Sequence, residues 1–133
     1  NTDSTGQFSA MYKPFHLIGM ELNISIFSAA LLNQSTGQTQ TFSGDVVATS
    51  KRALKKGEIL DGEGGATVWG KLIPVKDSLS NETLPIGLAH GIKLNKDIKE
   101  DQIITWKDVD YSSDDPTVSF RRSMEKNFRS SLD

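Results

Sequence analysis

Two stretches of the chain, KRALKKGEILD at 51–61 and NKDIKEDQIIT at 95–105, share one pattern at a constant offset of 44 residues. Each stretch has an apolar anchor, a turn position and then a pair of apolar residues. The matching positions are Leu54 and Ile98, Gly57 and Asp101, and the pairs Ile59, Leu60 and Ile103, Ile104. Gly and Asp suit a turn in which φ can be positive. Because one copy alone could not bury its apolar face, the repeat predicts two units of short strands related by a pseudo-twofold rotation, with both apolar pairs buried.

The composition changes sharply near Gly44. Residues 1–44 hold one Lys, no Arg and two acids, whereas all the other charged residues follow. Within this first segment, residues 17–32 are strongly apolar, and a stretch of this length without Pro favours a helix over a strand. The residues at helical spacing are Leu17, Met20, Ile24, Phe27 and Leu31. Since apolar residues occupy more than one face, the predicted helix needs cover from other protein.

The remaining elements are predicted from shorter signals. Residues 67–74 are strand-like, and the charged stretch around 77–83 is expected to be a loop. Asp114, Asp115 and Pro116 indicate a helix start, with an acidic cap before a proline in the first turn. The expected apolar stripe of this helix is Phe120, Met124, Phe128 and Leu132. A stripe so narrow predicts a helix that docks on a neighbour.

Together these signals predict an α+β fold in three parts. Residues 1–44 form an arm and an apolar helix that belong to a preceding domain, 45–111 form the β core, and 112–133 form a helical tail. The chain does not begin with Met and opens on polar residues, which we interpret as a piece of a longer protein.

Composition excludes several classes of function. There is no cysteine, so thiolate catalysis and cysteine-ligated metal sites are excluded. The formal net charge of −2 does not favour a nucleic-acid partner. No apolar run reaches membrane-spanning length and no secretory signal begins the chain, so we expect a cytoplasmic protein with no membrane partner.

The repeat resembles the SAF domain, a β-clip fold shared with type III antifreeze proteins and the C-terminal module of sialic acid synthase. The resemblance covers residues 45–111. It rests on VVA at 46–48, LKKGEILD at 54–61 and LAHGIKLNKDIKEDQIITWKDVD at 88–110, which closes on Asp108 and Val109. It implies a β-clip core of short strands with the pseudo-twofold repeat.

A narrower resemblance covers nearly the whole chain. MYKPFHLIGMEL at 11–22, VVATSKRALKKGEILDGEGGATVWGKL at 46–72 and LPIGLAHGIKL at 84–94 are similar to the C-terminal region of homoserine-dehydrogenase-like oxidoreductases. That group includes enzymes resembling a deoxyxylulose phosphate reductoisomerase. The resemblance implies an upstream Rossmann domain that binds NADP and a central catalytic domain. This chain holds no G-x-G-x-x-G motif.

Two functions follow as expectations. The first is a non-catalytic SAF module of an NAD(P)-dependent oxidoreductase, which supports active-site closure or oligomerisation. Its partners would be the upstream domains and further copies of itself, and it would hold no cofactor alone. The second is a free-standing module for carbohydrate or sugar acids, which the SAF resemblance implies. Ice binding is less favoured, because residues after Gly44 are highly charged.

The foremost candidate site is the turn containing Tyr12, Lys13 and His16. Lys13 supplies a positive charge, and His16 can donate a hydrogen bond at the start of the apolar helix, where free amides favour anions. Pro14 restricts the backbone of this turn. In the intact enzyme the turn would hold an anionic substrate; the alternative is that His16 only caps the helix.

Two weaker candidates lie in the β core. Glu63, in the GEGG turn at 62–65, could pair with Asp61, although a solvated acidic turn is the favoured interpretation. His90 has no second His at ligand spacing, so we expect a partly buried, hydrogen-bonded side chain instead of a metal ligand. Trp69 and Trp106 are expected in the core or an interface. No catalytic or metal-binding residue is predicted.

Overall fold

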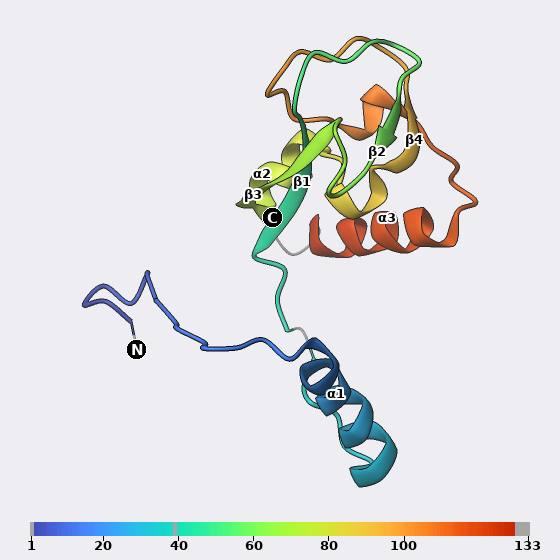
Figure 1. Ribbon diagram of the computed structural model, residues 1–133. Coiled ribbons are helices and arrows are strands. Elements are labelled where there is room, and N and C mark those ends of the chain that lie inside the picture. Colours follow the sequence, from blue (N-terminus) through green and yellow to red (C-terminus); the bar gives the residue numbers. More distant parts are fainter. Residues whose placement is uncertain (1, 39, 130–133) are drawn as a thin grey trace. The chain divides into compact units, whose positions relative to one another are not determined.

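The chain forms two compact units, Asn1–Gln40 and Thr41–Asp133. The computed structural model describes residues 2–38 and 40–129. In the first unit the helix α1 spans Ile18–Leu32, as the apolar stretch predicts (Figure 1). The second unit contains the elements β1 (Gly44–Ser50), β2 (Ile59–Asp61), β3 (Val68–Pro74), α2 (Val75–Asn81), β4 (His90–Leu94), β5 (Val109–Asp110) and α3 (Pro116–Arg129), with two 3₁₀ turns at Ile86–Leu88 and Trp106–Asp108.

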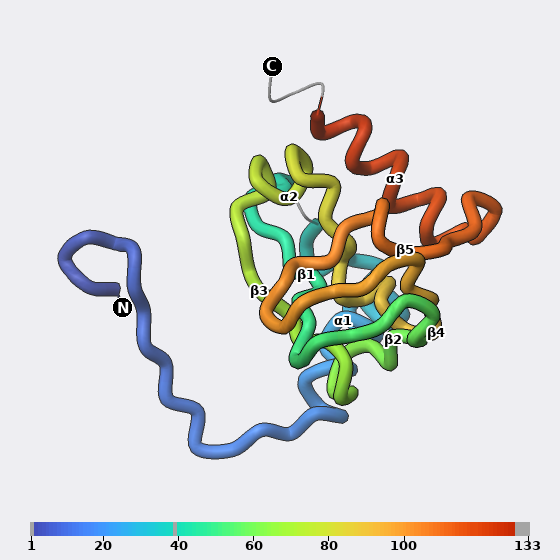
Figure 2. Tube along the Cα trace, turned by 90° about the horizontal axis from the view of Figure 1, so that it is seen from above, coloured from blue at the N-terminus to red at the C-terminus, as the bar shows by residue number. Residues whose placement is uncertain are grey.

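Two small antiparallel sheets make up the β structure of the described residues. β1 pairs with β3 along its whole length, from Gly44 opposite Pro74 to Ser50 opposite Val68. The second sheet has the order β2–β4–β5. The α2 and α3 helices lie beside these strands (Figure 2). The chain is therefore an α+β protein, and the strand predicted at 67–74 is confirmed as β3.

The two repeats meet at their equivalent apolar anchors. Leu54 and Ile98 face each other across an isolated bridge and exchange both backbone hydrogen bonds at 2.9 Å. A residue that pairs with its own equivalent lies at the axis of a twofold arrangement. The bridge therefore joins equivalent positions of the two repeats, as the predicted twofold arrangement requires.

Backbone hydrogen bonds away from this bridge also occur at equivalent positions of the two halves. The Gly57 amide donates to the Leu94 carbonyl at 2.8 Å. At the equivalent positions of the other half, the Asp101 amide donates to the Ser50 carbonyl at 3.1 Å. Strand β4 pairs with Ile59 just as β1 pairs with Ile103. The β1 and β4 strands thus have equivalent places in the two halves.

The turns of the two repeats also match in detail. Gly57 has φ of 90° and Asp101 has φ of 58°, the left-handed region that the Gly and Asp pattern predicts. In each turn a side chain accepts from the backbone three residues earlier: Glu58 from the Lys55 amide at 2.6 Å, and Gln102 from its counterpart Lys99 at 3.1 Å. The local hydrogen bonding of the repeat is conserved between the halves.

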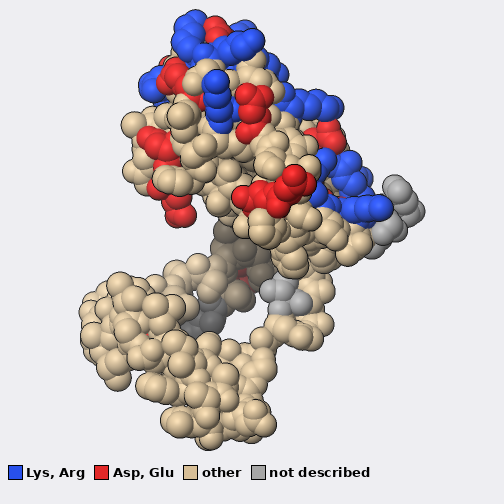
Figure 3. Space-filling model, turned by 90° about the vertical axis from the view of Figure 1, so that its right-hand side faces the viewer, with Lys and Arg blue, Asp and Glu red and all other residues tan. Residues whose placement is uncertain are grey.

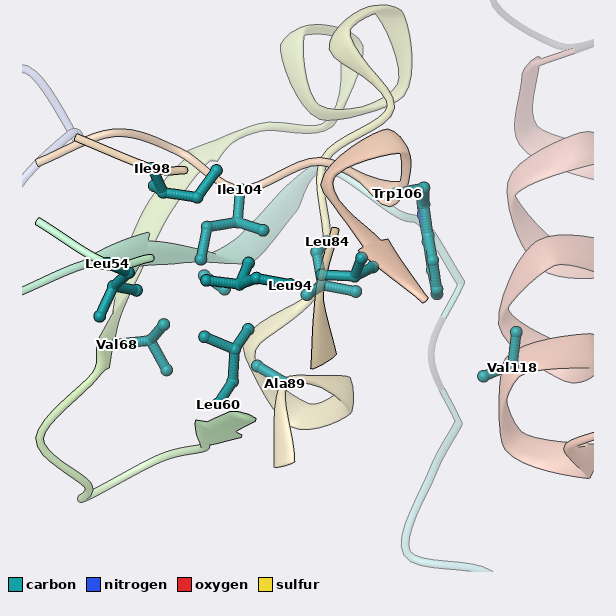
Figure 4. Packing of buried hydrophobic residues seen from close by; sticks show 12 residues of the cluster. Leu54, Leu60, Val68, Leu84, Ala89, Leu94, Ile98, Ile104, Trp106 and Val118 are labelled. Carbon is teal, nitrogen blue, oxygen red and sulfur yellow. The ribbon is translucent and has the colours of Figure 1, made fainter. Parts of the chain in front are cut away.

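The hydrophobic core lies between the two halves of the second unit (Figure 4). Its fully buried large side chains include Leu54, Leu60, Leu84, Leu94, Ile98 and Ile104. Each contributes about 1.5–3 kcal/mol of transfer free energy relative to an exposed side chain. One member of each apolar pair, Leu60 and Ile104, is buried as predicted.

The burial predicted for the other members of those pairs is wrong. Ile59 is 62 % exposed, and Ile103 is only half-buried. Both segments are extended, so consecutive side chains point to opposite faces. Only one residue of each apolar pair can face the core.

The prediction of a loop at 77–83 is also wrong, because helix α2 occupies Val75–Asn81. This short helix begins directly after Pro74 and is capped at its C-terminal end by Glu82, whose φ of 52° is left-handed. Val75 and Leu79, four residues apart, are buried on one face of the helix. The charged residues between them hide this helical spacing in the sequence.

The C-terminal helix begins where the sequence predicts, and its predicted apolar stripe packs only in part, since Met124 and Phe128 are half-buried. The Asp115 carboxylate accepts from the amides of Thr117 at 2.8 Å and Val118 at 3.1 Å, which caps α3 and lowers the pKa of Asp115. Phe120, from the predicted stripe, is 74 % exposed, whereas Val118 and Glu125 are buried. Leu132 lies outside the described residues.

Helix α1 buries none of its residues. Its exposed large apolar side chains include Ile18, Met20, Leu22, Ile24, Ile26, Phe27, Leu31 and Leu32. Such a helix, apolar on every side, is normally enclosed by other protein. Among the described residues, no helix combines the length and apolarity that crossing a membrane requires.

Candidate functional site

The turn before α1 brings Lys13 and His16 together on one carboxylate, that of Glu21. Lys13 Nζ pairs with Glu21 Oε1, and His16 Nδ1 lies 2.7 Å from Glu21 Oε2. The hydrogen bond from Lys13 is the main cause that lowers the pKa of Glu21. Tyr12 is 88 % exposed. The residues predicted to hold an anion therefore already share a carboxylate. Glu21 was not among the predicted site residues, because it lies inside the apolar helix, five residues after His16.

His16 does not cap α1. The cap position is Leu17, which makes no capping bond through its side chain. The Leu17 amide instead donates to Glu21 Oε1 at 3.2 Å. The Leu17 amide, which has no backbone acceptor within the helix, thus finds one in a side chain of the helix itself.

The GEGG turn is organised by Asp61. Its carboxylate accepts from the amides of Ala66 at 2.6 Å and Thr67 at 3.0 Å, and also from the Thr67 hydroxyl. These hydrogen bonds, that from the Thr67 hydroxyl foremost, lower the pKa of Asp61 from 3.8 to about 2. A Cβ at Gly65 would lie 2.1 Å from the Asp61 carboxyl carbon, so only glycine fits there. The Asp61 carboxylate thus binds its own turn, and Glu63 is exposed.

His90 is exposed, contrary to the partial burial expected, but it is hydrogen-bonded. Its Nδ1 lies 3.0 Å from the Asp61 carbonyl oxygen. A carbonyl oxygen only accepts, so Nδ1 donates and, in the neutral ring, Nε2 is an acceptor. Gly62, with φ of 76°, permits this approach, because a Cβ there would lie 3.0 Å from the His90 Cβ.

A pocket of about 350 Å³ lies beside His90. It is formed by residues of the 3₁₀ turn at Ile86–Leu88, of β4 and β5, and of the start of α3. Its lining residues are Gly87, Leu88, His90, Gly91, Ile92, Asp110, Tyr111, Ser112, Asp115, Thr117 and Val118. Of these residues, only His90 is a site candidate predicted from the sequence. No motif joins the other residues, which come together only in the folded second unit.

The aromatic residues support the side of this pocket nearest α3. The Tyr111 ring packs edge-on against Trp106, with ring centroids 5.0 Å apart. Trp106 is buried, as predicted, between the core and Val118 (Figure 4), and its Nε1 donates to Glu125 at 3.3 Å. Trp69, by contrast, is 39 % exposed on β3.

Helix α3 is held on the strands by a buried network of charges. Arg121 lies 2.5 Å from Asp45 Oδ2 on β1 and 2.8 Å from Glu125 Oε1 on its own helix. Burial lowers the pKa of Arg121, but the hydrogen bonds to Asp45 and Glu125 have the larger combined effect and raise that pKa. Arg122 extends the network, 2.6 Å from Glu125 Oε2. This network joins α3 to β1 through Asp45.

Charged side chains gather on the second unit, where Lys and Arg alternate with Asp and Glu over the visible face (Figure 3). In the part of the chain that the structure describes, no three His, Asp or Glu side chains converge as a metal ligand set requires. In comparisons with known proteins, no family model and no curated protein matches the chain.

Proposed function

We propose that the chain is a non-catalytic SAF module of a larger NAD(P)-dependent oxidoreductase, and that it serves active-site closure or oligomerisation. The main observation that supports this proposal is helix α1, which is apolar on all sides and buries no residue. A helix of this kind is stable when other protein surrounds it. In the proposed parent, the preceding domain supplies that cover.

The paired repeat supports a β-clip for the second unit. Its halves exchange hydrogen bonds around the bridge between Leu54 and Ile98, and a core closes between them. Val109, of the closing pair in the SAF pattern, is buried, and Asp108 accepts from the Thr105 amide at 2.9 Å. This unit has a core of its own, so the proposed module would fold around it and leave α1 to make contacts elsewhere.

The role of the turn at Tyr12, Lys13 and His16 is part of this proposal. An anionic substrate would have to compete with Glu21 for Lys13 and His16. In the intact enzyme we therefore expect Glu21→Gln to strengthen substrate binding if the turn holds the anion. An unchanged KM, with the fold intact, would leave the turn a structural role only.

Hydrogen exchange on the isolated chain and on the intact protein tests the assembly role. The amides of α1 should be protected in the intact protein and exchange much faster in the isolated chain, relative to the core amides of Leu54 and Ile98, when the isolated chain is dilute enough to be monomeric. Equal exchange of α1 in both forms would contradict the proposal.

Calorimetry of the isolated chain with NADPH tests the non-catalytic part. We expect no binding, since the cofactor fingerprint would lie in the upstream domain. Tight NADPH binding by this chain alone would overturn that assignment.

A further inference from the structure

Two residues that line the pocket, His90 and Asp110, have side chains that can accept a hydrogen bond. The His90 ring uses Nδ1 for the Asp61 carbonyl, which leaves Nε2 as an acceptor in the neutral ring. Asp110 contributes a carboxylate that makes no hydrogen bond or ion pair with another described residue. The opposite residue in the β4–β5 register is Lys93, whose side chain lies beside Gly57 instead.

The charge of the pocket selects among ligand classes. Its lining includes two carboxylates, Asp110 and Asp115, and no Lys or Arg. Asp115 accepts two amide hydrogen bonds at the start of α3, so Asp110 is the carboxylate with more acceptor capacity left for a ligand. An anion such as a sugar acid would meet uncompensated negative charge here, whereas a cation would be attracted.

An aromatic ring stands next to this carboxylate. Tyr111 follows Asp110 directly, is 41 % exposed and is held by its edge contact with Trp106. An aromatic face attracts an ammonium group within about 6 Å of its centroid. The apolar residues Leu88, Ile92 and Val118 also line the pocket and can contact a short alkyl chain.

We propose that this pocket binds a small organic ammonium ion. The ammonium donates to the Asp110 carboxylate and to Nε2 of His90, and the Tyr111 ring provides the cation–π contact. A volume of about 350 Å³ is at the small end of the range for ligand pockets. This binding function goes beyond the assembly role, because it needs only residues of the second unit.

An NMR titration of the chain with n-butylammonium chloride tests the proposal, with 1-butanol and sodium butyrate as matched probes at equal ionic strength. We expect saturable shifts of the Gly87, Gly91 and Tyr111 amides with the ammonium ion. Butanol should bind about fivefold or more weakly, because it lacks the charge. Equal binding of butanol, or binding of butyrate, would overturn the proposal.

Two variants of equal charge locate the interaction. Asp110→Asn should weaken n-butylammonium binding about fivefold, because the ion loses its carboxylate. Asp114→Asn removes the same charge close by, outside the pocket lining, and should leave binding within about twofold. If the two variants behave alike, the attraction is a general surface charge effect and the proposed site is wrong.

A second pair of variants tests the aromatic contact. Tyr111→Phe keeps the ring and should keep the affinity, whereas Tyr111→Leu should reduce it about threefold. Unchanged binding by both variants would exclude the ring from the site.

Discussion

At the scale of single residues, the two turns of the repeat reach one conformation with different side chains. Gly57 has φ of 90°, and Asp101 reaches 58°, where Asp is tolerated. We expect Gly57→Ala to lower the free energy of unfolding by about 1–2 kcal/mol, because a Cβ is strained at this φ. Asp101→Gly should change it by less than about 0.5 kcal/mol. Urea denaturation of both variants measures the difference, and equal losses would contradict the account.

Asp61 gives a pH-dependent test at the same scale. Its folded-state pKa is lowered to about 2 from 3.8, so its contribution to stability is present above the unfolded-state pKa. That contribution is lost as pH falls through about 2. We expect Asp61→Asn to be less stable than the native chain at neutral pH, and the gap to narrow as the pH drops from about 4 to about 2.

Thermal unfolding across this pH range measures the gap, with Glu63→Gln as the control. Glu63 lies in the same turn and is exposed, so its loss should leave stability unchanged at every pH. A gap for Asp61→Asn that persists at pH 2 would show that the turn depends on shape and not on the carboxylate charge.

At the scale of elements, α3 depends on Arg121 for its place on the strands. Arg121→Met would leave Asp45 and Glu125 as buried carboxylates without this partner, which costs about 3–5 kcal/mol of unfolding free energy. Lys126→Met removes the same charge from the exposed side of α3 and should change little. Urea denaturation compares the two. A loss below about 1 kcal/mol for Arg121→Met would show that apolar contacts alone hold the helix.

At the scale of the whole molecule, the exposed helix α1 predicts self-association of the isolated chain. Burial of its apolar side chains against a second copy would remove them from water, the dominant driving force of association. Light scattering should therefore give a mass above that of one chain. Ile24→Lys on α1 should shift the mass towards one chain, whereas Leu72→Lys, at an exposed apolar residue of β3, should not. A monodisperse monomer at high concentration would contradict the prediction.

The sequence by itself determined the features that depend on neighbouring residues. The repeat at 51–61 and 95–105, the helix at α1, the strand at β3 and the cap of α3 at Asp115 all follow from local pattern. Periodicity, turn chemistry and capping act over a few residues, so they can be read without knowing the fold.

Only the tertiary structure decided which faces are buried and which charges pair. Ile59 and Leu60 are adjacent and similarly apolar, yet Leu60 alone faces the core. On α3, Arg121 pairs with Asp45, which lies 76 residues earlier in the chain. The pocket beside His90 likewise gathers residues from β4, β5 and α3. Such contacts depend on how distant segments are placed in space, and the local sequence around each residue does not encode that placement.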